Sequence, residues 1–124
     1  MKIVIAEDEE ALAKALQTKF KNAGFDIYPA SDGVQALEMI RSAQPDIIAL
    51  DLLMPKKNGF EVLQEVKSDP DLKNIPVVVL SNLGQDEEIK RALQMGAEDY
   101  LVKTQHPINE IVEKFKMLVL KKSK

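Results

Sequence analysis

Short apolar segments alternate with longer amphipathic segments along the chain, and this alternation limits the possible folds more than any other feature. The apolar segments are KIVIA at 2–6, DIYPA at 26–30, DIIAL at 46–50, PVVVL at 76–80 and DYLVK at 99–103. Runs such as IVIA, IIAL and VVVL are apolar at every position, as strands buried on both faces of a sheet require. The alternation therefore predicts an α/β fold in which a five-stranded parallel sheet is covered by helices on both faces.

The segments between these strands show helical spacing of apolar residues and helix boundary signals. Leu12, Leu16 and Phe20 fall on one face of the first predicted helix, as expected of a helix that packs on a sheet. The boundary signals are Gly24 after the first helix, Ser31-Asp32 before the second, Asp69-Pro70 after the third, Gly96 after the fourth and Pro107 before the fifth. Glycine suits the position that ends a helix, and Ser or Asp suits the position that begins one.

Length and composition bound the class of protein. With 124 residues, of which 45% are hydrophobic, the chain suits one domain over residues 1–121, followed by a basic tail at 122–124. The absence of cysteine excludes disulfides and cysteine-ligated metals, and a single histidine, His106, excludes polyhistidine metal sites. The net charge of -3 argues against nucleic-acid binding. The chain shows neither a signal peptide nor an apolar stretch of roughly 20 residues, so we expect a cytoplasmic protein that does not enter a membrane.

Reactive side chains follow several of the predicted strands at the ends where ligands bind. Glu7 and Asp8 follow the first strand, Asp51 follows the third, Ser81 follows the fourth and Lys103 ends the fifth. In an open parallel sheet, ligands bind beyond the carboxyl ends of the strands, where the strand order reverses. If the order is 2-1-3-4-5, the acids meet at that point, and they repel one another unless a cation neutralises them. Oxygen ligands of this kind suit Mg²⁺.

Each of these residues also has a simpler interpretation when taken alone. Glu7 and Asp8 would cap the first helix, where negative charge is favourable. Asp51 would be a surface loop acid, Ser81 would cap the fourth helix or bind its own loop, and Lys103 would be a solvated lysine. Their shared position at the same ends of different strands favours a common site, because capping does not predict such agreement.

The order and spacing of these residues resemble the receiver domain of response regulators in bacterial two-component signalling. The resemblance rests on the acidic pair Glu7-Asp8, on Asp51 within DLLMPKKNG, on Ser81 after PVVVL and on GAEDYLVK at 96–103. It covers essentially the whole chain. It implies a doubly wound, flavodoxin-like (βα)5 fold and a protein that works as a phosphorylation-activated switch.

The resemblance also assigns roles to individual residues. The residues that it assigns to Mg²⁺ are Glu7, Asp8, Asp51 and, through its backbone carbonyl, Leu53. Asp51 is implied to be the phosphoacceptor, while Ser81 and Lys103 would bind phosphoryl oxygens. Such roles agree with the chemistry, because phosphoryl transfer depends on positioning and on neutralisation of charge. On phosphorylation Ser81 would move toward the phosphoryl group and Tyr100 would turn inward behind it.

The sequence departs from the common receiver pattern at several positions. Many receivers have Asp where this chain has Glu7, which would then bind Mg²⁺ through water. Asn82 stands where a small residue is usual, which predicts restricted access for the phosphoryl group. Thr104 replaces a proline that follows a cis bond in many receivers, and we predict a trans bond there because a non-proline cis bond costs about 2.5–4 kcal/mol. By the resemblance, Leu53 and Leu83 would flank the route of attacking water, and because neither can orient water they predict a long-lived phosphorylated form.

Two surfaces are candidates for partner binding. Ala11, Ala15 and Thr18 form an outward strip of small residues on the first helix, and we expect a sensor histidine kinase or a histidine phosphotransfer protein to dock there. Met117 and Leu120 lie off the apolar stripe of the last helix. By the resemblance they fall on the α4–β5–α5 output face, so we expect them to contact an output partner, whose identity stays unknown, or a second copy after phosphorylation.

We expect a receiver module that is not an enzyme, since the chemistry that it carries out is limited to its own phosphorylation and dephosphorylation. Several alternatives compete with this interpretation. A haloacid-dehalogenase-type phosphatase also uses an aspartyl nucleophile, but it has a second aspartate where this chain has Leu53. A flavodoxin-like electron carrier needs a Ser/Thr/Gly-rich phosphate loop, whereas this chain has AEDEEAL after the first strand. The third alternative is a receiver cut from a longer regulator with a DNA-binding or enzymatic output domain.

Overall fold

The computed structural model describes residues 1–122 and confirms the predicted topology. Within that range parallel strands form one sheet in the order β2-β1-β3-β4-β5. The strands are β1 (Lys2–Ala6), β2 (Asp26–Ala30), β3 (Ile47–Leu50), β4 (Val77–Ser81) and β5 (Asp99–Val102). The predicted basic tail lies largely outside the described residues.

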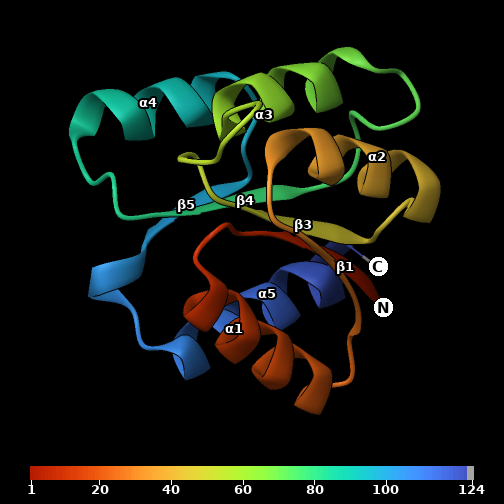
Figure 1. The fold of residues 1–124 in the computed structure, drawn as a ribbon, viewed down its shortest axis with the longest axis vertical. Helices are drawn as coiled ribbons and strands as arrows, with labels where there is room; N and C mark the ends of the chain where they lie inside the picture. Colours follow the sequence, from red (N-terminus) through yellow and green to blue (C-terminus); the bar gives the residue numbers. More distant parts are fainter. Residues whose placement is uncertain (123–124) are drawn as a thin grey trace.

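The helices cover both faces of the sheet, with α1 and α5 on one face and α2, α3 and α4 on the other (Figure 1). Their bounds are α1 (Glu10–Asn22), α2 (Gly33–Ala43), α3 (Gly59–Ser68), α4 (Asp86–Gln94) and α5 (Ile108–Lys122), and a short 3-10 helix, η1 (Lys103–Gln105), precedes α5. The predicted boundary signals work as expected: the Asp32 side chain accepts a hydrogen bond from the Gln35 backbone, and Gly24 ends α1 with a φ of +95°. No described helix is long and apolar enough to cross a membrane.

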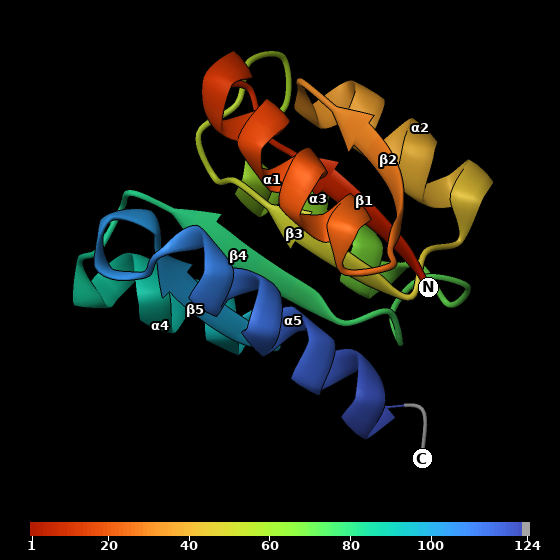
Figure 2. The ribbon, with the colours of Figure 1, turned by 90° about the horizontal axis from the view of Figure 1, so that it is seen from below.

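Each face of the sheet has its own core layer. Between the sheet and helices α1 and α5, Phe20 and Phe115 are fully buried and pack edge to face with ring centres 5.1 Å apart. On the opposite face Ile40 and Leu63 anchor α2 and α3 against the strands. Figure 2 shows α1 and α5 lying over the same side of the sheet. The helices hold the strands in place from both sides, which fixes the positions of the loops at the strand ends.

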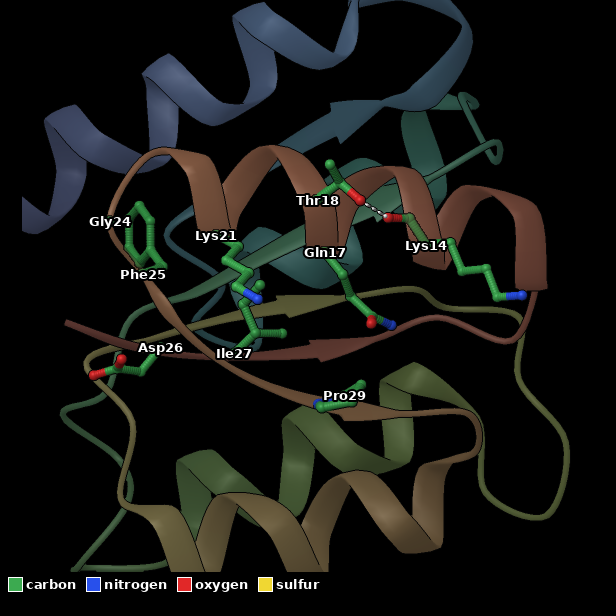
Figure 3. Close-up of a pocket in the computed structure, with 9 residues that line it drawn as sticks. All are labelled: Lys14, Gln17, Thr18, Lys21, Gly24, Phe25, Asp26, Ile27 and Pro29. Carbon is green, nitrogen blue, oxygen red and sulfur yellow. Dashed lines mark hydrogen bonds between the residues drawn. The ribbon is translucent and has the colours of Figure 1, made fainter.

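Strand β2 forms one edge of the sheet, beside a shallow groove along α1. The Asp26 backbone N–H donates to the Met1 carbonyl, and the Ala30 carbonyl accepts from the Glu7 N–H. The backbone groups of alternate residues of β2 therefore point toward β1, and those of the residues between them point away from the sheet. Pro29 occupies an outward position, where its missing N–H costs no hydrogen bond to β1. Figure 3 shows side chains of α1, among them Lys21, extending over the groove toward β2.

Candidate functional site

The acids of the predicted site are brought together by the pairing of β1 with β3. Ala6 pairs with Leu50 in the register of these strands, and the Asp51 backbone donates to the Ala6 carbonyl at 3.0 Å. The chain therefore leaves both strands at the same level of the sheet. Glu7, Asp8 and Asp51 each place a carboxylate oxygen within 4.8 Å of the other two.

Lys103 reaches the same point from η1, directly after β5. Its Nζ atom lies 2.5 Å from Oε1 of Glu7 and 3.3 Å from Oδ2 of Asp51, and its side chain is almost buried. Burial lowers the pKa of this amine, but the Glu7 and Asp51 carboxylates outweigh that effect and raise it above its usual value. Lys103 is thus a charged member of the site, and the interpretation as a solvated lysine is wrong.

Glu7 has the strongest change in acidity at the site. The residue is 3% exposed, and this burial, together with the charge of Asp51, raises its pKa to about 7, although Lys103 and the Glu9 backbone partly counteract them. Its Oε2 atom accepts a hydrogen bond from Glu9 at 3.1 Å. Glu9 itself is the N-cap residue of α1 and no side chain caps that helix, so the interpretation of Glu7 and Asp8 as helix caps is wrong.

Asp51 is 5% exposed, so it is not the surface loop acid of the simpler interpretation. Its Oδ1 atom accepts a hydrogen bond from the Leu53 backbone at 3.3 Å. Gly59 packs directly against it, because a Cβ atom at Gly59 would lie 2.3 Å from the Asp51 carbonyl oxygen. Glycine is therefore needed at the start of α3 for space.

Ser81 and Tyr100 meet around one residue of the loop after β4. The buried Ser81 hydroxyl accepts a hydrogen bond from the Leu83 backbone at 3.2 Å, and the Tyr100 hydroxyl donates to the Leu83 carbonyl. Tyr100 is 8% exposed and points inward, and burial raises its pKa despite the opposing effect of the Ser81 hydroxyl. The local loop bond expected for Ser81 is present, whereas Gln85 is the N-cap residue of α4.

Sequence reasoning missed the acceptor for Tyr100. That acceptor is the backbone carbonyl of Leu83, and a backbone carbonyl leaves no trace in the residue types of a sequence. The available signal is the position of Leu83, two residues after Ser81 in the chain.

The loop between β5 and α5 has the predicted trans bond between Lys103 and Thr104. The chain then forms η1, and the Pro107 carbonyl accepts the first hydrogen bond of α5 from Ile111 at 3.1 Å. Asn82 is exposed and lines the acidic pocket, and its effect on access for the phosphoryl group stays a prediction.

The predicted partner residues lie outside this pocket. On α1, Ala11 and Thr18 are exposed and Ala15 is half-buried. On α5, Met117 is 67% exposed and Leu120 is 59% exposed, away from the stripe that packs on the sheet. Both groups are therefore accessible to another protein.

The residues of the acidic pocket fit a divalent cation. The pocket has a volume of about 280 Å³ and is lined by Glu7, Asp8, Glu9, Asp51, Leu53, Asn82 and Lys103. Oε1 of Glu7 is buried without a well-formed hydrogen bond, although it contacts the Lys103 ammonium. Closely spaced carboxylate oxygens are the ligands that Mg²⁺ prefers.

Comparison with known sequences gives one consistent result. The response regulator receiver domain model matches residues 3–116. The probable transcriptional regulator ycf27 of Guillardia theta is 37% identical over 106 residues, which cover 86% of this chain and 41% of that protein. The DNA-binding dual master transcriptional regulator RpaA of Synechocystis sp. PCC 6803 is 36% identical over 82% of this chain and 42% of that protein. The chain thus spans about two fifths of the length of these curated relatives.

Solved structures agree with this result. The receiver domain of the Francisella response regulator 1452 has a TM-score of 0.89 and 32% identity, and the match covers 99% of this chain and 98% of that one. A chain of the CheX–CheY–BeF3–Mg²⁺ complex from Borrelia burgdorferi has a TM-score of 0.86 and 27% identity, and the match covers 95% of this chain and 88% of that one. Receiver domains bind Mg²⁺ in an acidic pocket, and Glu7, Asp8 and Asp51 form an acidic cluster here.

Proposed function

Because the chain belongs to the response regulator receiver family, we propose that it is a phosphorylation-activated switch that accepts a phosphoryl group on Asp51. The observation that carries this proposal is the buried ammonium of Lys103, which contacts both Glu7 and Asp51 beside Asp8. A fixed cation next to a buried carboxylate offsets the charge that a phosphoryl group brings.

The proposed reaction transfers the phosphoryl group from a phosphohistidine. A carboxylate oxygen of Asp51 forms a bond to phosphorus, the P–N bond of the donor breaks, and its electron pair returns to the imidazole nitrogen. Lys103 offsets charge on the phosphoryl oxygens and the Ser81 hydroxyl donates to one of them. The residues that would hold Mg²⁺ are Glu7, Asp8, Asp51 and the backbone carbonyl of Leu53. When bound, Mg²⁺ supplies further neutralisation of charge on the phosphoryl group.

The proposed switch connects this site to the α4–β5–α5 surface through Leu83. Both Ser81 and Tyr100 form hydrogen bonds with the backbone of Leu83. A movement of Ser81 toward the phosphoryl group therefore breaks one of the two hydrogen bonds that hold the loop before α4. Phosphorylation then favours one of two arrangements of that surface. Tyr100 already points inward in this structure, so we propose that phosphorylation stabilises this inward position of the ring.

The partners follow from the same proposal. A sensor histidine kinase or a histidine phosphotransfer protein docks on the strip of Ala11, Ala15 and Thr18 in the cytoplasm, and the output partner or a second copy binds at Met117 and Leu120. A second candidate is a receiver that forms part of a longer DNA-binding regulator. It is favoured by the names of the curated relatives and by their greater length. In either case we propose that residues 1–122 do not themselves bind DNA.

Mass measurement with a small phosphodonor tests the proposal. The protein is incubated with acetyl phosphate with and without Mg²⁺, and its intact mass is compared with that of Asp51→Asn. We expect a gain of a single phosphoryl group that requires Mg²⁺ and is absent from the variant. Asp26→Asn, which removes an exposed carboxylate from β2, is the matched control and should gain the same mass as the parent. A folded parent that gains no mass would contradict the proposal.

A further inference from the structure

Gly33, the first residue of α2, is packed against the loop that follows Asp51. We call residues 52–58 the Asp51 loop. A Cβ atom at Gly33 would lie 1.9 Å from the carbonyl oxygen of Lys57 and 2.6 Å from its carbonyl carbon. These are backbone atoms, which cannot move aside as the end of a flexible side chain can. Glycine is required here by the close approach of two backbone segments.

The contact with Gly33 is part of a wider attachment between α2 and the Asp51 loop. The Gly33 backbone donates a long hydrogen bond, 3.4 Å, to the carbonyl of Pro55. The Asp32 carboxylate lies 3.6 Å from the Lys56 ammonium and also caps α2 by accepting from the Gln35 backbone at 2.8 Å. Asp32 is buried although its partner Lys56 is exposed. The start of α2 thus contacts three consecutive residues of the loop.

The Asp51 loop carries backbone groups that belong to the candidate site. The N–H of Leu53 donates to Asp51 Oδ1, and the Leu53 carbonyl is the backbone ligand that the proposed function assigns to Mg²⁺. The loop is fixed at its far end by Gly59, whose N–H donates to the Leu52 carbonyl at 2.9 Å. Between these points Lys56 adopts a left-handed φ of +67°, which a lysine rarely adopts without support from its surroundings.

We propose that Gly33 is a positioning residue for the acidic pocket, because its lack of a side chain lets the Asp51 loop lie close enough for the Leu53 carbonyl to serve as a ligand. The inference rests on the proposed function. Real Cβ atoms essentially never approach another atom closer than 3.0 Å, so a methyl group at Gly33 displaces the loop by about 1 Å. Magnesium tolerates little distortion, since its ligands lie at about 2.0–2.1 Å in near-octahedral geometry.

The test compares Mg²⁺ affinity between two Gly→Ala variants of the full chain by titration calorimetry. We expect Gly33→Ala to weaken Mg²⁺ binding by about 10–100-fold, the loss typical when the support of a ligand is removed. Gly24→Ala is the matched control, because Gly24 has a φ of +95° with nothing within 4 Å of its Cβ position. It should lose stability through backbone strain and still bind Mg²⁺ within about twofold of the parent. Equal affinities of Gly33→Ala and the parent would overturn the inference.

A second variant decides the matter if Gly33→Ala does not fold. Asp32→Ala removes the ion pair to Lys56 and the cap of α2 while leaving every acid of the pocket in place. We expect weaker Mg²⁺ binding and faster amide hydrogen exchange at Leu53 and Lys57. Unchanged affinity and unchanged exchange in this variant would overturn the inference.

The outcomes also separate this inference from the proposed function. If the parent is phosphorylated on Asp51 and Gly33→Ala binds Mg²⁺ equally well, the inference alone fails. If the parent binds Mg²⁺ and Gly33→Ala does not, but Asp51 accepts no phosphoryl group, the proposed function alone fails. A parent that binds no Mg²⁺ overturns both.

Discussion

The carboxyl group of Glu7 makes the metal-free site sensitive to pH. Its pKa rises from 4.5 to about 7 on folding, so the ionised form is less favourable in the folded protein than in the unfolded chain. The contribution of Glu7 to stability is therefore fully present below pH 4.5 and is lost as the pH rises to about 7. Such a difference in pKa corresponds to roughly 3 kcal/mol at most.

We therefore expect the free energy of unfolding of Glu7→Gln to exceed that of the parent at pH 8 and to match it near pH 4.5, because glutamine stays neutral. Urea denaturation in the presence of a chelator at these pH values measures the difference. Glu38→Gln, which changes an exposed glutamate, should follow the parent at each pH. A Glu7→Gln variant that is less stable than the parent at pH 8 would contradict the prediction.

The leucines beside the site predict a slow loss of the phosphoryl group. Leu53 is exposed at the rim of the acidic pocket, and Leu83 is half-buried beside Ser81. Neither side chain can orient a water molecule, and we expect both to hinder the approach of water to the phosphoryl group. We expect Leu83→Gln and Leu53→Asn to shorten the lifetime of the phosphorylated protein, as measured by the decay of its intact mass after removal of the donor. A parent that decays as fast as these variants would contradict this expectation.

At the scale of elements, the start of α3 depends on the absence of a side chain at Gly59. A methyl group there would press on the Asp51 carbonyl, and overpacking of this kind costs about 1–3 kcal/mol. We expect Gly59→Ala to lower the free energy of unfolding by that amount in urea titrations. Gly84→Ala is the matched control, because its Cβ would meet only ordinary contacts with Val102 at 3.5 Å. Equal stabilities of the two variants would refute this account.

The elements themselves were largely predictable, because hydrophobic period and boundary residues are local signals. The end of the sheet where the acids lie followed from the alternation of strands and helices, because parallel strands end at the same edge. The strand order 2-1-3-4-5 was assumed and is the order that the resemblance to receiver domains implies. Helical spacing of apolar residues does not by itself determine which of them are buried: Val34 of α2 and Leu93 of α4 are apolar but exposed. The close approaches at Gly33 and Gly59 could not be predicted, since they join segments that are distant along the chain and depend on backbone atoms common to every residue.

At the scale of the whole molecule, the exposed side chains of α5 predict the surface through which the phosphorylated protein associates. Met117 and Leu120 contribute little to the core, so Met117→Gln with Leu120→Gln should leave folding and phosphorylation of Asp51 unchanged. We expect sedimentation to detect association of the phosphorylated parent and none for the double variant. Val34→Gln, which changes an exposed residue of α2, should associate like the parent. Equal association of the double variant and the parent would exclude this surface.

The proline of the edge strand β2 protects the sheet from aggregation at high local concentration. A sheet grows into a fibre when the backbone of its outermost strand offers a regular row of donors and acceptors to another chain. Pro29 removes a donor from the middle of that row in β2, and the opposite edge, β5, is only four residues long. Many copies of this domain can therefore be concentrated around one signalling complex, or several can be joined in one polypeptide, without pairing between the edge strands of different copies.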